Sequence, residues 1–341
     1  MGLPGAWLRV WGVREFGRTL PVGAVHLVDA SIECRKVVYP APVARHISER
    51  FAFRVRSSAA VGARAVWFFW DDCTRFPRPK RRSAPWKSLK EDTALPVPYL
   101  RNLGKNCVLE SVEQYVVAWF QHRYIPPEGV DVRMYSRGAV FRPQSSGGLV
   151  DPAWKFGEAD AKIAFHSLQL GKTGSVVFST DLDMLVLLAV SGSEDSVLVL
   201  GGGRTFLVRD VADRFREVYG SCASAVFAVG CGKTDLTAPL RKGVGPAGIH
   251  RAMSAEFRSS AAFVVDEDGT INNEAASRVI QRIHGVGQSR AGGKGGEEER
   301  GDGGRGGRVR VRNGVGSGVR RLIGYWTSVR GQGPAPAAEG G

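Results

Sequence analysis

Short hydrophobic runs separated by polar segments organise the first two thirds of the chain. Val25–Val28, Val66–Trp70 and Gly174–Ser179 are apolar, rich in β-branched and aromatic residues, and typical of buried strands. Ala159–Leu170 predicts a helix, and Met184–Val190 continues as a buried apolar segment. Buried strands alternating with helical segments predict an α/β fold with a central, mostly parallel sheet flanked by helices.

Each of the three predicted strands ends next to an aspartate, at Asp29, Asp71 and Asp181. The carboxyl ends of strands form the binding crevice of an open parallel sheet, so we expect these acids to converge there. On an extended backbone Asp183 would point to the same side as Asp181. Asp72 directly follows Asp71, which leaves open which of the two faces the crevice.

Glu158 and Asp160 open the predicted helix, and they can share a site only from its first turn. Any one of these acids alone is explained by solvent exposure, but several together repel unless a cation neutralises them. Mg²⁺ prefers such oxygen ligands. The whole chain carries a net charge of +14, which favours an anionic partner such as nucleic acid. The combination predicts magnesium-dependent phosphodiester chemistry.

The chain also resembles the XPG/flap endonuclease family in a collinear series of short motifs over roughly residues 1 to 255. The matching segments are Met1–Gly5, Leu27–Ser31 (LVDAS), Phe69–Asp71 (FWD), Gly157–Ala161 (GEADA), Ser179–Leu185 (STDLDML), Gly232–Leu236 (GKTDL) and Lys242–Pro246 (KGVGP).

The resemblance implies a PIN-like 5′-nuclease fold over residues 1–284, with an N-terminal part (1–100) and an internal part (145–255). A helix-two-turn-helix module that grips duplex backbone is expected near 235–255. Two Mg²⁺ ions are implied, with Mn²⁺ as a substitute. One ion would be held by Asp29, Asp71, Glu158 and Asp160, and the other by Asp181, Asp183 and Asp235.

Further roles are expected for cations and glycines. Lys80 and Arg82 are candidates to stabilise charge on the transferring phosphoryl group, or simply to steer phosphates. Gly2, Gly243 and Gly245 are candidate nucleic-acid contacts, since glycine permits close backbone approach.

The substrate is less well defined, because the chain departs from the family pattern. Leu236 rather than Tyr follows Asp235, and the basic, proline-broken Arg75–Arg82 segment replaces a long helical arch and suggests a short gateway. The Gly243–Pro246 turn favours cleavage of DNA near single-strand/duplex junctions. The alternatives are a host-shutoff-type ribonuclease acting on messenger RNA, another PIN-like ribonuclease, and an inactive nucleic-acid-binding homologue.

Composition limits the remaining possibilities. Five scattered cysteines without a CxxC pair argue against a disulfide framework or a zinc site and fit a reducing compartment. No run of about eighteen apolar residues predicts a membrane span, and Arg9 interrupts any signal-peptide core. We expect an intracellular monomer, with the nucleus favoured and the cytoplasm as the alternative.

The composition changes near Gly285, and residues 285–341 are expected to form a disordered Gly/Arg-rich tail. Its RGG-like segments either bind nucleic acid or merely add solubility. Leu322, Tyr325 and Trp326 resemble a sliding-clamp-binding peptide, although Val319 stands where Gln is expected.

Overall fold

The computed structural model describes residues 5–17, 19–37, 39–72, 86–98, 106–145, 147–232 and 243–291, together with residues 319, 320, 323, 324 and 329. The chain divides into two compact units. The larger comprises residues 14–211 with 329–341, and the smaller comprises 1–13 with 212–328. Each unit is described by itself.

The larger unit is built on one eight-stranded sheet with the order β5-β4-β3-β2-β1-β6-β7-β8. Five neighbouring strands, from β3 to β7 in this order, are parallel, whereas β4, β5 and β8 are antiparallel to their neighbours. This confirms the predicted mostly parallel sheet. The strands are β1 (Val25–Asp29), β2 (Ala65–Phe69), β3 (Asp131–Ser136), β4 (Ala139–Phe141), β5 (Leu149–Val150), β6 (Ser175–Phe178), β7 (Val197–Leu200) and β8 (Arg204–Leu207).

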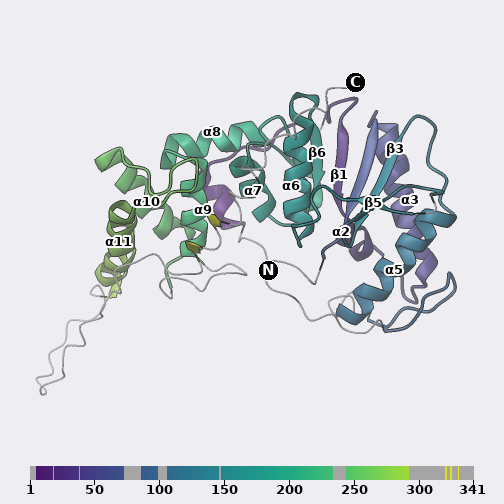
Figure 1. Cartoon of the computed structure of the whole chain (residues 1–341). Coiled ribbons are helices and arrows are strands. Elements are labelled where there is room, and N and C mark those ends of the chain that lie inside the picture. The colour runs from purple at the N-terminus through teal and green to yellow at the C-terminus, as the bar shows by residue number, and fades with distance from the viewer. Residues whose placement is uncertain are drawn as a thin grey trace, which may run out of the picture. The chain divides into compact units, whose positions relative to one another are not determined.

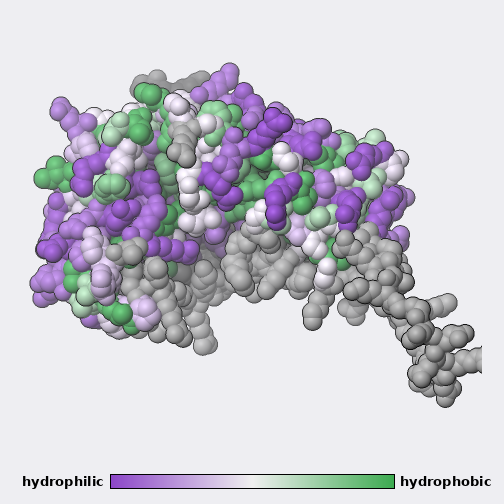
Figure 2. All heavy atoms as spheres, turned by 180° about the vertical axis from the view of Figure 1, so that it is seen from behind, coloured by the Kyte–Doolittle hydropathy of each residue, from purple (hydrophilic) through white to green (hydrophobic). Residues whose placement is uncertain are grey.

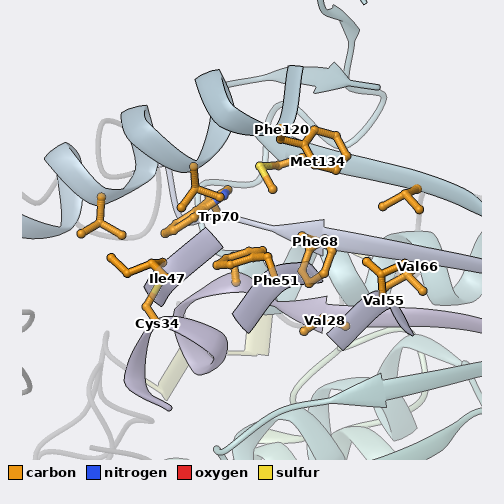
Figure 3. Packing of buried hydrophobic residues seen from close by; sticks show 14 of the residues in the cluster. Val28, Cys34, Ile47, Phe51, Val55, Val66, Phe68, Trp70, Phe120 and Met134 are labelled. Atoms are coloured by element: carbon orange, nitrogen blue, oxygen red, sulfur yellow. The ribbon is translucent and has the colours of Figure 1, made fainter. Parts of the chain in front are cut away.

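Helices cover both faces of this sheet, which explains why the central strands are apolar throughout (Figure 1). The helices of this unit are α2 (Ala30–Arg35), α3 (Ala44–Ala60), α5 (Asn106–His122), α6 (Ala159–Leu170) and α7 (Asp183–Ser191). On one face Phe51 from α3 and Phe120 from α5 pack over Phe68 and Met134 (Figure 3). On the other face α6 packs on β1, β2 and β6.

The order of the strands reverses between β1 and β6. From β1 the chain builds β2 and then β3 on one side, and later β6 and β7 on the other. Val25 pairs with both Ala65 and Ser175, so the three strands that precede the predicted acids are adjacent and in register. A ligand crevice is expected at such a switch point, outside the carboxyl ends of the strands.

The smaller unit is helical. It contains α1 (Ala6–Trp11), most of α8 (Val208–Tyr219), α9 (Cys222–Cys231), α10 (Pro246–Ser260) and α11 (Asn273–Ala291). Trp7 stacks on Trp11, which meets the edge of Phe215 from α8. The helices α9 and α10 flank the segment where the sequence predicts a helix-two-turn-helix module.

One local prediction in this region was wrong. Asp181 and Asp183 do not lie on an extended backbone, because Leu182 between them is helical (φ −69°, ψ −21°) and Asp183 begins α7. Met184–Val190, apolar on every side, is the interior of this buried helix. An all-apolar run of this length does not reveal whether it is strand or helix.

The boundary predicted at Gly285 was also wrong, since α11 continues through it to Ala291. Beyond α11, Val319, Ile323 and Val329 are buried, which is not the behaviour of a disordered tail at these positions. Leu322, Tyr325 and Trp326, the predicted clamp-binding residues, lie outside the described part of the chain.

Three further observations concern membrane-spanning helices, the surface and the cysteines. None of the described helices is long and apolar enough to cross a membrane. Hydrophilic residues cover much of the face in Figure 2, with smaller hydrophobic areas between them. The cysteines within the described ranges, Cys34, Cys107, Cys222 and Cys231, form no disulfide bonds with one another.

Candidate functional site

Asp29 is the last residue of β1 and the N-cap of α2. Its Oδ1 accepts a hydrogen bond from the backbone N–H of Ser31 at 2.8 Å, which fixes the carboxylate where strand becomes helix. Burial, followed by repulsion from Asp71, raises the pKa of Asp29 to about 7. An acid at this strand end is therefore held in a position where its ionised form is unfavourable.

Asp71 follows β2 and connects this strand to α6. Its Oδ1 accepts a hydrogen bond from the N–H of Ala159 at 2.8 Å, and the neighbouring Asp72 N–H donates to the carbonyl of Gly157 at 2.5 Å. Asp71 raises the pKa of both Asp29 and Asp160, whereas buried Asp72 is not among the main causes of either rise, and both Asp71 and Asp72 act on Lys162. Asp71 is thus the residue that faces the other acids.

Asp160 lies in the first turn of α6, two residues after the N-cap Glu158. Burial raises its pKa well above the ordinary value, and four further carboxylates add to the rise. In decreasing order they are Asp29, Asp71, Glu158 and Asp181. Acids from the ends of β1 and β2, the start of α6 and the turn after β6 therefore lie near enough to Asp160 to raise its pKa.

Asp181 and Asp183 lie in the turn between β6 and α7. The Asp181 N–H is held by Ser179 Oγ at 3.1 Å, and its carbonyl accepts from Met184 N–H at 3.3 Å. Both side chains are partly exposed. The turn brings Asp181 into the electrostatic environment of Asp160 without the extended geometry predicted for this pair.

The donor set fits a hard divalent cation in its chemistry. Every donor is a carboxylate, the ligand type that Mg²⁺ and Ca²⁺ prefer, and a cation would relieve the mutual repulsion. The carboxylates lie farther apart than the ligands of a bound metal ion do. Among the described residues no three His, Cys, Asp or Glu side chains are close enough to form a metal site.

Lys162 is a residue that sequence reasoning missed. It is fully buried in α6, and its Nζ donates to the Trp70 carbonyl at 3.2 Å, just before Asp71. Burial lowers its pKa, while Asp151, Asp72 and Asp71 oppose that change. A lysine inside an otherwise apolar helix stretch, four residues after Glu158, was the available signal. Lys162 fastens α6 to the end of β2 and so positions the acids.

The glycine turn is partly described. Gly243 has a left-handed backbone (φ +87°), and Gly245 is the N-cap of α10 with Pro246 at its first position. A Cβ added at either glycine would meet no atom of the described residues within 4 Å, so with respect to these residues the backbone is open to approach. The other candidates, Asp235, Lys80, Arg82 and Gly2, lie outside the described residues.

Comparisons with known proteins give a likeness in structure only. None of the protein-family models matches the chain, and no curated protein sequence is significantly similar to it. The chain is similar to a solved structure of the catalytic core of Rad2 in complex with DNA substrate (complex IV). That match has a TM-score of 0.42 and 14% identity, and it covers 81% of this chain and 78% of the other.

A second structure of the Rad2 catalytic core with DNA substrate (complex III) matches with a TM-score of 0.43 and 15% identity. It covers 84% of this chain and 80% of that one. Likeness at this level leaves the functional argument to the chain's own residues.

Proposed function

We propose that the chain is a metal-dependent nuclease that hydrolyses phosphodiester bonds. The observation that carries the proposal is the group of carboxylates around Asp160, at the switch point of a parallel sheet in a protein of net charge +14. Such a protein has many cations available to neutralise acids, yet neighbouring carboxylates raise the pKa of Asp29 and Asp160.

The carboxylates would hold two Mg²⁺ ions, which when bound supply an activated water and stabilise the leaving oxygen. Asp29 and Asp71 are pre-oriented by hydrogen bonds to Ser31 N–H and Ala159 N–H. Lys162 keeps the start of α6 against the end of β2. The chain's own contribution is thus to hold acids from four elements at one place despite their repulsion.

For the substrate, we favour DNA near a junction between single strand and duplex. The open backbone at Gly243 and Gly245, at the start of α10, suits contact with phosphates rather than reading of bases. Such a contact would depend on the nucleic-acid backbone and not on its bases. It predicts little preference for sequence.

A cleavage assay with purified full-length protein tests the proposal. The substrates are end-labelled DNA flaps, hairpins and single strands, together with RNA of matching sequence, in Mg²⁺, Mn²⁺, Ca²⁺ or EDTA. We expect cleavage with Mg²⁺ and Mn²⁺, and binding with little cleavage in Ca²⁺, whose looser coordination shell does not hold the reacting geometry. Full activity in EDTA would contradict metal dependence.

The variant Asp181→Asn should lower turnover by about 1000-fold or more while largely sparing DNA binding, because it removes a metal ligand and leaves phosphate-contacting cations in place. The matched control is Asp195→Asn, which changes a surface acid paired with Arg209 and should keep activity. If single-stranded RNA is cut in preference to every DNA junction, the assignment moves to a host-shutoff-type ribonuclease. Binding without cleavage of any substrate would indicate an inactive homologue.

A further inference from the structure

A pocket separate from the candidate metal site lies in the larger unit, on the face of the sheet that carries α6. The antiparallel strands β4 and β5 extend the sheet beyond the parallel strands. Tyr135, Val140 and Leu149 form one row across β3, β4 and β5, through the pairs Tyr135↔Val140 and Val140↔Leu149. Their exposed fractions rise outward along this row, from 1% through 7% to 65%. The helix α6 therefore covers only part of this face of the sheet.

The step between α6 and the uncovered row forms a pocket of about 510 Å³, which we call the β5 pocket. Its lining includes Trp67, Arg133, Tyr135, Leu149, Phe165 and His166. This volume falls within the range of small-ligand sites. It contains none of the carboxylates of the candidate metal site. Asp160 and His166 are six residues apart on α6, about 9 Å along the helix axis.

The inner wall of the β5 pocket is aromatic and fixed in place. The His166 ring lies 4.6 Å from that of Tyr135, 5.4 Å from Phe165 and 5.8 Å from Trp67. His166 Nε2 is 3.3 Å from Oδ1 of the buried Asp151, and Oδ1 also accepts from Ala153 N–H. Because each ring is held by its neighbours, a planar ligand would meet a surface that needs little rearrangement.

The rim of the β5 pocket is cationic. The Arg133 guanidinium lies 4.6 Å above the Trp67 ring and pairs with Asp131 at 2.8 Å, and 29% of its side chain remains exposed. Arg142 is exposed and forms no ion pair with any described residue. One guanidinium at the mouth is thus available for an anionic group.

We propose that the β5 pocket binds a single nucleotide, with the base against the aromatic wall and the phosphate on Arg142 and Arg133. An aromatic wall beside guanidinium groups suits the flat, apolar faces of a base and the charge of its phosphate. The nucleotide is either a free mononucleotide or an unpaired nucleotide of a strand. The inference rests on the pocket and not on the proposed nuclease activity.

Displacement of a fluorescent AMP analogue from full-length protein in EDTA tests this inference. Without metal the proposed cleavage cannot consume the ligand, so a failure here is distinguishable from a failure of the proposed function. AMP should displace the analogue more effectively than adenosine does. Arg142→Ala should weaken AMP binding about tenfold and leave adenosine nearly unchanged, because it removes only the contact with phosphate.

A second variant and a matched control keep the test decisive. Leu149→Asp places a carboxylate at the mouth of the pocket, on an exposed side chain where the fold should tolerate it, and should also weaken AMP binding about tenfold or more. Arg204→Ala removes an exposed arginine from β8, at the opposite edge of the sheet, and should bind AMP like the unmodified chain. Thermal melting of each variant checks that it is folded.

The source of the nucleotide is read from competition with a ten-residue oligothymidylate. If the oligothymidylate displaces the analogue, and if Arg142→Ala weakens this displacement, the pocket binds a nucleotide within a strand. Displacement by AMP alone supports a free mononucleotide. If the analogue does not bind saturably, or if Arg142→Ala and Leu149→Asp both bind AMP like the unmodified chain, the proposal is overturned.

Discussion

Two acids in the larger unit, Glu33 and Asp160, lie in opposite electrostatic surroundings. Glu33 in α2 is fully buried and is surrounded by cations, with Lys36, Arg50 and Arg54 at 3.0, 3.4 and 2.7 Å. Asp160 is surrounded by other carboxylates, which raise its pKa. The fold therefore supplies cations to an acid that has a structural role. Around Asp160 the strand-end acids act mainly on one another, and we propose that a metal ion neutralises them.

The largest expected effect tests the Glu33 side of this comparison. Glu33→Gln removes the only acid among three cations and should lower the free energy of unfolding by about 3 kcal/mol. This is the low end for a broken buried pair, because the cations are partly solvated. Glu49→Gln, on the exposed face of α3, is the control and should change stability by less than about 0.5 kcal/mol. Urea unfolding measures both. If both substitutions lower the free energy of unfolding by similarly small amounts, the pairing of Glu33 with the three cations does not stabilise the fold.

Added Mg²⁺ should produce the next largest effect. At about 100 times its Kd, an ion that binds only the folded state stabilises it by about 2.7 kcal/mol. The Tm should rise with Mg²⁺ in the unmodified protein and barely rise in Asp160→Asn. A shift of the same size in both would place the ion elsewhere.

The pH dependence of this effect follows from Asp29, whose pKa rises from 3.8 in the unfolded chain to about 7 in the fold. Between these values the folded state binds more protons at Asp29, so the contribution of Asp29 to the stability of the metal-free protein falls as pH rises from about 4 to about 7. Mg²⁺ binds the ionised carboxylates, so its stabilisation should be larger at pH 8 than at pH 5. Thermal melts at both pH values, with Mg²⁺ and with EDTA, check the sign.

A smaller effect of opposite sign is expected at Asp160. In the absence of metal, Asp160→Asn removes one of the repelling charges and should stabilise the protein by about 0.5–2 kcal/mol while it abolishes cleavage. Urea unfolding in EDTA measures the first change and the nuclease assay the second. Loss of stability would show that the Asp160 carboxylate, like that of Glu33, supports the fold.

The smallest expected effect concerns the glycine turn. Gly245→Leu should leave stability within about 0.5 kcal/mol, since the added side chain meets open space, and should raise KM for junction DNA about fivefold while sparing single strands. Gly243→Ala is the contrasting variant, because its left-handed backbone makes any side chain unfavourable by about 1 kcal/mol. Equal increases of KM on both substrates would mean that the turn only supports the fold.

The sequence predicted those features that depend on local pattern. The apolar runs before Asp29 and Asp71 located β1 and β2, and α6 begins and ends where predicted, at Ala159 and Leu170. The expectation that the acids lie at one edge of the sheet came from a general rule about parallel sheets.

Features that depend on packing were not predictable in this way. The apolar Met184–Val190 run has no periodicity to distinguish helix from strand, and Gly285 lowers helix propensity without ending α11. Buried Lys162 becomes meaningful only when its bond to the Trp70 carbonyl is known. The β5 pocket arises from the register of β3, β4 and β5, which no single segment encodes.

The pairing of β1 with β6 has a consequence for synthesis of the protein. Val25 must find Ser175, which leaves the ribosome long after β1, β2 and β3 have been made. Contacts between residues so distant in sequence form slowly and late in folding. A nascent chain that carries Asp29 and Asp71 still lacks Asp181, so the acids cannot assemble until most of the sheet exists. The order of the strands would thus delay the proposed nuclease activity until most of the sheet has formed.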